Sequence, residues 1–256
     1  MSTNPYAAPR AQVADDTVIP LGNFLPAGRS VPTGNGWTWI ADAWSLFRQR
    51  AGLLIGMFVV SALIMVALVF IPVIGVIAQS LLWPVFIAGF VITFRRIERG
   101  EPVEFGELFA GFRQGLGTLI ATGVIGMLIS ALIVFVAIAV LGTAFFSTAS
   151  AEVTAAQLMS LALVSLVILA LLLPLIMALW FAPALVVFHD MGAWEAMKAS
   201  FRGGMKNMLP FLLYGIVLTV ASVVASIPAL LGWLVLGPVI AGSICTSYRD
   251  IYFSEA

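Results

Sequence analysis

Charged residues are scarce in this sequence. Asp, Glu, Lys and Arg make up 9% of the 256 residues, against about 25% in an ordinary soluble domain. Their signs balance to a formal net charge of 0, which excludes the basic surface that a nucleic-acid-binding protein needs. The single cysteine, Cys245, excludes an intrachain disulfide and a cysteine-based zinc site. We interpret it as a small packing residue.

Hydrophobic residues account for 62% of the chain, and the mean hydropathy is +1.11. They form six stretches, at about 52–71, 73–94, 116–141, 158–188, 208–227 and 229–248. A membrane-spanning helix needs about 20 such residues, so we expect an all-α membrane protein with six transmembrane helices. The fourth stretch is longer than required, and we expect it to kink near Pro174 and to leave the membrane near Pro183.

The first 35 residues differ from the rest in composition. Five of the thirteen prolines fall there and no apolar periodicity is present, which predicts a disordered cytoplasmic tail at 1–35 and a transmembrane domain at 36–256. The motif NPYAAP at 4–9 is the best candidate in the tail for a peptide ligand of a protein partner.

Short amphipathic segments precede three of the apolar stretches. The clearest is Glu104–Gln114, where Phe105, Leu108, Phe109 and Phe112 follow a helical spacing. Similar segments occur at Trp39–Arg50 and Trp194–Gly204. Each is too short and too polar to span a bilayer, so we expect it to lie in the interface with its aromatic side chains toward the lipid.

The order of amphipathic helix, span, turn and proline-bearing span occurs three times. It predicts three parallel helix-pair repeats, at about 37–97, 103–190 and 192–250, related by a pseudo-threefold axis along the membrane normal. The prolines of the second spans are Pro84, Pro174 and Pro238.

The basic residues predict the orientation. With six spans, all twelve Lys and Arg residues fall on one side, and the three turns on the other side carry only Glu152. Positive residues stay on the cytoplasmic side. We therefore expect a multi-pass membrane protein with both termini in the cytoplasm.

Arginine recurs at one position of the three amphipathic segments, as Arg48, Arg113 and Arg202. At the headgroup level each could pair with a lipid phosphate, and Arg95 and Arg96 could do the same. The alternative is that these residues only anchor and orient the chain.

Two other clusters could carry chemistry. His189 beside Asp190 suggests a catalytic pair, although no nucleophile with a recognisable context accompanies it. Four glutamates spaced by three, Glu98, Glu101, Glu104 and Glu107, could bind a divalent cation, but Pro102 interrupts them and we interpret them as a solvated segment. We expect no metal site and no cofactor.

Several motifs resemble an uncharacterised family of proteobacterial integral membrane proteins. They are NPYAAP, LFAGFR, PLIMALWFAPALVVF, AMKASFRGGMKNMLPF and the terminal SYRDIY. More distantly, the layout is similar to the membrane domain attached to some glycerophosphodiester phosphodiesterases. This resemblance implies a helical inner-membrane protein and carries over no catalytic residue.

The function class follows from what the spans contain. No Asp, Glu, Lys, Arg or His lies in the middle of a predicted span, which argues against a proton-coupled pump. We expect a non-enzymatic membrane protein that acts through membrane lipids, including anionic ones, or through protein partners on the cytoplasmic side. The alternative is a small transporter or permeation path for a neutral or lipid-like solute.

Overall fold

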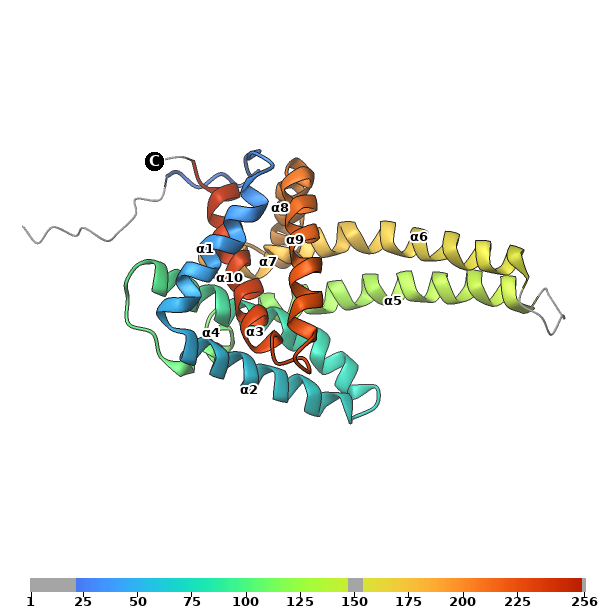
Figure 1. The fold of residues 1–256 in the computed structure, drawn as a ribbon, viewed down its shortest axis with the longest axis horizontal. Coiled ribbons are helices and arrows are strands. Elements are labelled where there is room, and N and C mark those ends of the chain that lie inside the picture. The colour runs from blue at the N-terminus through green and yellow to red at the C-terminus, as the bar shows by residue number, and fades with distance from the viewer. Residues whose placement is uncertain (1–21, 147–153, 255–256) are drawn as a thin grey trace, which may run out of the picture.

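A computed structural model of the chain describes residues 22–146 and 154–254, and most of this part is helical (Figure 1). The elements are α1 (Asn35–Gln49), α2 (Ala51–Val69), α3 (Ile74–Glu98), the 3-10 helix η1 (Phe105–Phe109), α4 (Ala110–Arg113), α5 (Leu116–Phe146), α6 (Ala155–Trp180), α7 (Ala182–His189), α8 (Ala193–Lys206), α9 (Met208–Ser226) and α10 (Trp233–Tyr252). The NPYAAP motif and Glu152 lie outside the described residues.

Five segments are long and apolar enough to cross a membrane. They are Ala51–Val69, Ile74–Glu98, Leu116–Ala139, Gln157–His189 and Met208–Ser226. The chain therefore has the composition of a multi-pass membrane protein, as predicted. The predicted sixth span, α10, is not among the five. Its second half contains Ser243, Thr246 and Ser247 and is buried against other helices, so it needs less apolar surface than a helix that faces lipid.

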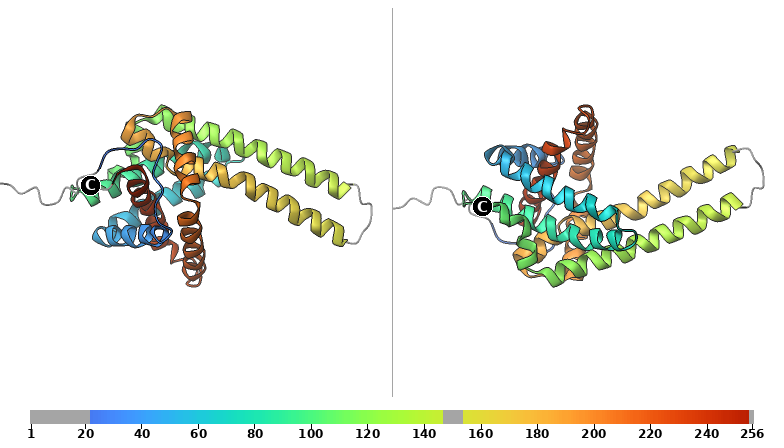
Figure 2. Two further views of the ribbon diagram at one scale, coloured as in Figure 1. Left: turned by 90° about the horizontal axis from the view of Figure 1, so that it is seen from above. Right: turned by 90° about the horizontal axis from the view of Figure 1, so that it is seen from below.

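The long helices form three hairpins, α2–α3, α5–α6 and α9–α10, which diverge from one region (Figures 1 and 2). The α5–α6 hairpin projects from the rest, and α9 runs crosswise to it. This differs from the parallel bundle that we expected. In an 18-residue stretch of each apolar segment, half of the residues from Ile74–Glu98 are buried, against 6% of those from Gln157–His189. Most buried residues of α3 lie between Pro84 and Ile97, away from the turn of its hairpin.

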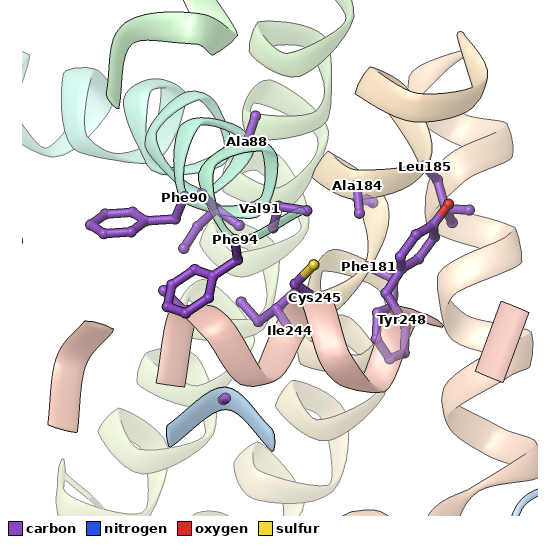
Figure 3. Close-up of a cluster of buried hydrophobic side chains, with 14 of the residues drawn as sticks. Ala88, Phe90, Val91, Phe94, Phe181, Ala184, Leu185, Ile244, Cys245 and Tyr248 are labelled. Carbon is purple, nitrogen blue, oxygen red and sulfur yellow. The ribbon is translucent and has the colours of Figure 1, made fainter. Parts of the chain in front are cut away.

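The core lies where α3, α7 and α10 come together (Figure 3). Phe94 of α3 and Cys245 and Tyr248 of α10 are buried there, beside Phe181 and Leu185 at the start of α7. Cys245 is 1% exposed and lies among apolar side chains, which agrees with its interpretation as a packing residue.

The predicted fourth span is divided by a break at Phe181 rather than at Pro174. Helix α6 continues through Pro174, and Pro183 lies in the first turn of α7, where a missing N–H costs least. A serine from another helix fills the break. The Phe181 N–H donates to Ser200 Oγ at 3.0 Å, and Ser200 Oγ donates to the Met177 carbonyl at 2.6 Å. The hydroxyl thus replaces the bond that would join Phe181 to Met177 in a continuous helix.

All three predicted amphipathic segments contain helix. The apolar face of α1 lies against protein, whereas the aromatic side chains of the middle segment stay partly exposed. Trp39, Ala43 and Phe47 of α1 are buried, and α1 packs on α10 and α9. The middle segment is a 3-10 helix followed by one α-helical turn, and of its predicted apolar stripe only Leu108 is buried. These helices therefore form the inner support of the hairpins.

Glycine allows the middle segment to lie directly on α3. A Cβ at Gly111 would overlap the Val85 carbonyl oxygen, and a Cβ at Gly89 would overlap the Leu108 carbonyl oxygen. Removing the side chain on both helices lets the two backbones touch, as small residues do between membrane helices. The contact places η1 and α4 against the proline-bearing half of α3.

Candidate functional site

A polar hub forms at the end of α10, around Arg249 and Asp250. The Asp250 carboxylate accepts hydrogen bonds from Asn35 Nδ2 at 2.8 Å, Trp39 Nε1 at 2.8 Å and Arg29 Nη2 at 3.1 Å. It therefore ties α1 and the segment before α1 to the last helix of the chain.

Arg249 joins one further helix, α3, to this hub and adds a second contact with α1. Its guanidinium donates to Glu98 at the end of α3 and, at 3.0 Å, to Asp42 of α1. Burial disfavours the charged form of Arg249, but the carboxylates of Glu98 and Asp42 outweigh this and raise its pKa. The group stays charged at every physiological pH, so its role is structural.

Residues 22–34 form an ordered strap across α8, α9 and α10, and here the predicted disordered tail is wrong. Leu25 N–H donates to the Tyr252 carbonyl at 2.8 Å, and Phe24 forms a β-bridge with Phe253. Asn207, fully buried between α8 and α9, accepts from Val31 N–H at 2.8 Å and donates to the Arg29 carbonyl at 2.8 Å. These bonds satisfy backbone groups, which a purely compositional argument cannot anticipate. Residues 1–21 lie outside the described part.

Basic residues from separate segments meet at this end of the molecule. Arg29 contacts Asp250, Lys206 Nζ donates to the Gly28 carbonyl at 2.9 Å, and Arg249 contacts Glu98. The distribution of positive charge in the sequence predicted that these segments lie on one side of the membrane.

The five predicted headgroup arginines have different environments. Arg48 and Arg202 are exposed, and no ion pair involves either of them within the described residues. The Arg113 side chain is 64% exposed and lies 3.9 Å from Glu107. These three guanidinium groups are accessible to a ligand.

Arg95 is buried and the partly exposed Arg96 is paired with a carboxylate, which argues against their predicted role. The Arg95 side chain is 8% exposed, lies 3.8 Å from Glu98, and stands over the rings of Phe188 and Phe253. Arg96 donates to Glu107 at 2.9 Å. Neither guanidinium reaches a headgroup without leaving these partners.

The glutamate run is paired with arginine, and the interpretation of it as a solvated segment is wrong for two of its members. Glu98 and Glu107 have side chains only 8% and 11% exposed, held by Arg249 and Arg96. Within the described residues, no group of three or more His, Cys, Asp and Glu is placed to hold a metal ion.

His189 lies in an aromatic cluster below the strap. Its Nε2 is 2.5 Å from Tyr248 Oη, and its ring stacks on Phe24 with 3.5 Å between centroids. The ring is thus packed by residues from the strap and α10, rather than positioned by the neighbouring Asp190, whose backbone ends α7 in a left-handed conformation.

A cavity of about 620 Å³ lies between the hairpins and could accept a ligand. It is bounded by α2, α3, the α6–α7 break and α10; lining residues include Ala62, Trp83, Phe86, Trp180, Gly237 and Ile244. On α10 the lining runs from Trp233 to Ile244, about 16 Å at 1.5 Å per residue. We call it the central cavity.

The central cavity is apolar and opens to the surface of the molecule between the hairpins. Its rim includes Val66, Trp83 and Ile176, which are 54%, 60% and 50% exposed. Ser61 lines it, but its hydroxyl already donates to the Phe58 carbonyl at 2.9 Å. Trp180 also lines it, and its buried indole N–H has no hydrogen-bond partner among the described residues. The volume falls in the range of about 300–1,000 Å³ that is typical of ligand pockets.

Sequence reasoning missed most of this arrangement. Nothing in the spacing of Asn207, Ser200 or Asp250 marks them as anchors. The only usable signal was the polar ending of α10, in the SYRDIY motif, because a charged pair at the end of an apolar helix requires partners nearby.

Comparison with known families identifies one match. Residues 108–248, more than half of the chain, match the model of a family described as Domain of unknown function (DUF7847). The matched region begins at LFAGFR and includes the two long motifs of α6–α7 and α8–α9, whereas NPYAAP lies before it. No curated protein and no solved structure matches the chain.

Proposed function

The chain belongs to the family of the domain of unknown function DUF7847, and we propose that it is a non-enzymatic multi-pass membrane protein that binds membrane lipids. The central cavity carries this proposal. Its lining is almost entirely apolar and its rim is exposed at the level of the candidate spans. In a bilayer, the molecules that meet such an opening are lipid acyl chains.

The cavity gives a ligand little polar contact, because the Ser61 hydroxyl is bonded to the Phe58 carbonyl and the Trp180 N–H is buried. Arg48, Arg113 and Arg202 add a general attraction to phosphate, about 1 kcal/mol for each basic residue near the surface. Arg95 is buried and Arg96 is paired with Glu107, so we assign neither a part in it.

The test is retention of lipid after gentle extraction, measured by native mass spectrometry. Ala62→Phe on α2 places a ring in the central cavity and is expected to remove a bound mass of lipid size. The matched control is Ala67→Phe on the same helix, whose side chain is exposed and outside the lining. Equal lipid retention in both variants would refute the proposal.

We further propose that α10 is a sixth crossing, so that three repeats share one orientation and both termini lie in the cytoplasm of a bacterial inner membrane. The meeting of basic segments at the hub supports this.

The test uses single cysteines in a Cys245→Ala background. Phe70→Cys and Ile227→Cys, at exposed turn ends, should react with an impermeant maleimide in intact cells, and Gln49→Cys should not. If a tag added at the C-terminus were instead found outside the cytoplasm, the chain would cross the membrane five times.

The same cavity favours a second candidate, passage of a neutral or lipid-like solute. Transport predicts that fluorescent lipid analogues cross proteoliposome bilayers faster with wild-type protein than with Ala62→Phe. Lipid retention without any acceleration supports binding alone.

A further inference from the structure

We infer a second lipid site, for one anionic phospholipid, in a groove under α8; it rests on the proposed function because it requires the chain to sit in a bilayer. The groove has a volume of about 250 Å³ and lies between α5, α6 and α8. Its lining includes Ile129, Pro174, Ala178, Trp194, Lys198 and Phe201. We call it the α8 groove, and it shares no residue with the central cavity.

The charge at the α8 groove is positive and unpaired. Lys198 lines it, and Arg202 follows four residues later on the same side of α8. Both are exposed, and no ion pair involves either within the described residues. The acidic residue of α8, Glu195, is also exposed and takes part in none of these pairs. Two neighbouring cations without a carboxylate partner suit a phosphate.

The walls of the groove identify the rest of the ligand. Apart from Lys198, the lining is apolar, and it includes Trp194, which is 57% exposed. Exposed tryptophan beside lysine is typical of the headgroup level of a bilayer, where both keep an apolar body and a polar end. A free cytosolic anion would use the cations but leave the apolar walls in water. A phospholipid uses both, with one acyl chain against α6.

The groove is held in shape before any ligand binds. Ser200 lies between Met197 and Phe201 of α8, which both line the groove, and its hydroxyl is bonded to Phe181 and Met177 across the break after α6. This fixes α8 across the base of the α5–α6 hairpin (Figure 1). A site that need not be ordered on binding keeps more of its interaction energy as affinity.

The experiment measures binding of phosphatidylglycerol and phosphatidylcholine with identical acyl chains to the full-length protein, by native mass spectrometry in a neutral detergent. Lys198→Gln with Arg202→Gln should weaken binding of one phosphatidylglycerol about thirtyfold and remove its preference over phosphatidylcholine. The control pair, Arg50→Gln with Arg99→Gln, removes the same charge from exposed positions outside the groove and should change binding less than threefold.

A second pair of variants tests the groove itself. Ala178→Phe places a ring in the groove, while Ala170 on the same helix is exposed and outside the groove. Only Ala178→Phe, and not Ala170→Phe, should therefore abolish the tight binding of phosphatidylglycerol. The inference would be overturned if both double variants lost the same affinity for phosphatidylglycerol. It would also be overturned if the Lys198→Gln, Arg202→Gln variant still preferred phosphatidylglycerol over phosphatidylcholine. Retained lipid without headgroup preference refutes this site and leaves the central cavity standing. Selectivity that persists in Ala62→Phe supports this site independently of the cavity.

Discussion

Ser200→Ala tests whether a side chain from α8 maintains the break between α6 and α7. The substitution removes one acceptor for the Phe181 N–H and one donor to the Met177 carbonyl, both at a position that is fully buried. A buried polar group left without a partner costs about 1–3 kcal/mol. Two such groups predict a loss of about 2–6 kcal/mol in the free energy of unfolding.

The two orphaned groups are four residues apart and could restore the loss by bonding to each other. That would close the break and make α6 and α7 continuous. Phe181 would then leave its edge-to-face contacts with Tyr252 and Phe211, whose centroids are 5.3 and 5.9 Å from its own. Each aromatic pair contributes about 0.5–1.5 kcal/mol beyond burial. Closing the break would therefore regain one hydrogen bond but lose these aromatic contacts.

The assay is denaturant or thermal unfolding in detergent, together with hydrogen exchange at the Phe181 amide. Ser45→Ala is the matched control, because Ser45 is exposed and donates to the Asp42 carbonyl at 2.8 Å within its own helix; its effect should stay within about 0.5 kcal/mol. If Ser200→Ala is as stable as this control and Phe181 exchanges no faster, the hydroxyl does not hold the break.

Two further substitutions test the hub and the contact of η1–α4 with α3. Asp250→Ala removes the acceptor of three side-chain donors and should cost about 2–4 kcal/mol of unfolding free energy. Glu104→Ala removes an exposed carboxylate that makes no side-chain cap bond and should cost far less. Similar melting temperatures of the two variants would contradict the hub. Gly111→Ala pushes a methyl group into the Val85 carbonyl and should destabilise by about 1–3 kcal/mol. Gly106→Ala on the preceding 3-10 helix has open space around it and serves as the control, so equal thermal stability of these two would show that α3 can move aside.

The helical class and most helix positions could be predicted because they depend on local properties. An unbroken run of apolar residues must satisfy its own backbone in lipid, and only a helix does so within one segment. The predicted first span at 52–71 and α2 at Ala51–Val69 differ by only one or two residues at each end. The amphipathic segments before α2, α5 and α9 were recognised by the same local reasoning.

Predictions failed where a residue's environment depends on distant partners. Composition predicted disorder for residues 22–34, yet Asn207 and the end of α10 bind their backbone. Arg95 resembles the surface arginines in sequence, and only the packing of Phe188 and Phe253 around it shows that it is buried. The break at Phe181 likewise requires Ser200, which periodicity in α6 cannot reveal.

The sequence by itself therefore determined an all-helical chain with segments apolar enough to cross a membrane, and the places where its helices begin. These follow from hydrophobicity and hydrogen bonding within a few residues of each position. Tertiary structure decided which polar groups meet and where space is left. Trp39 reaches Asp250 across 211 residues, and the central cavity exists because the three hairpins diverge from their common core. Packing geometry of this kind is a property of several helices together, and no single stretch of sequence encodes it.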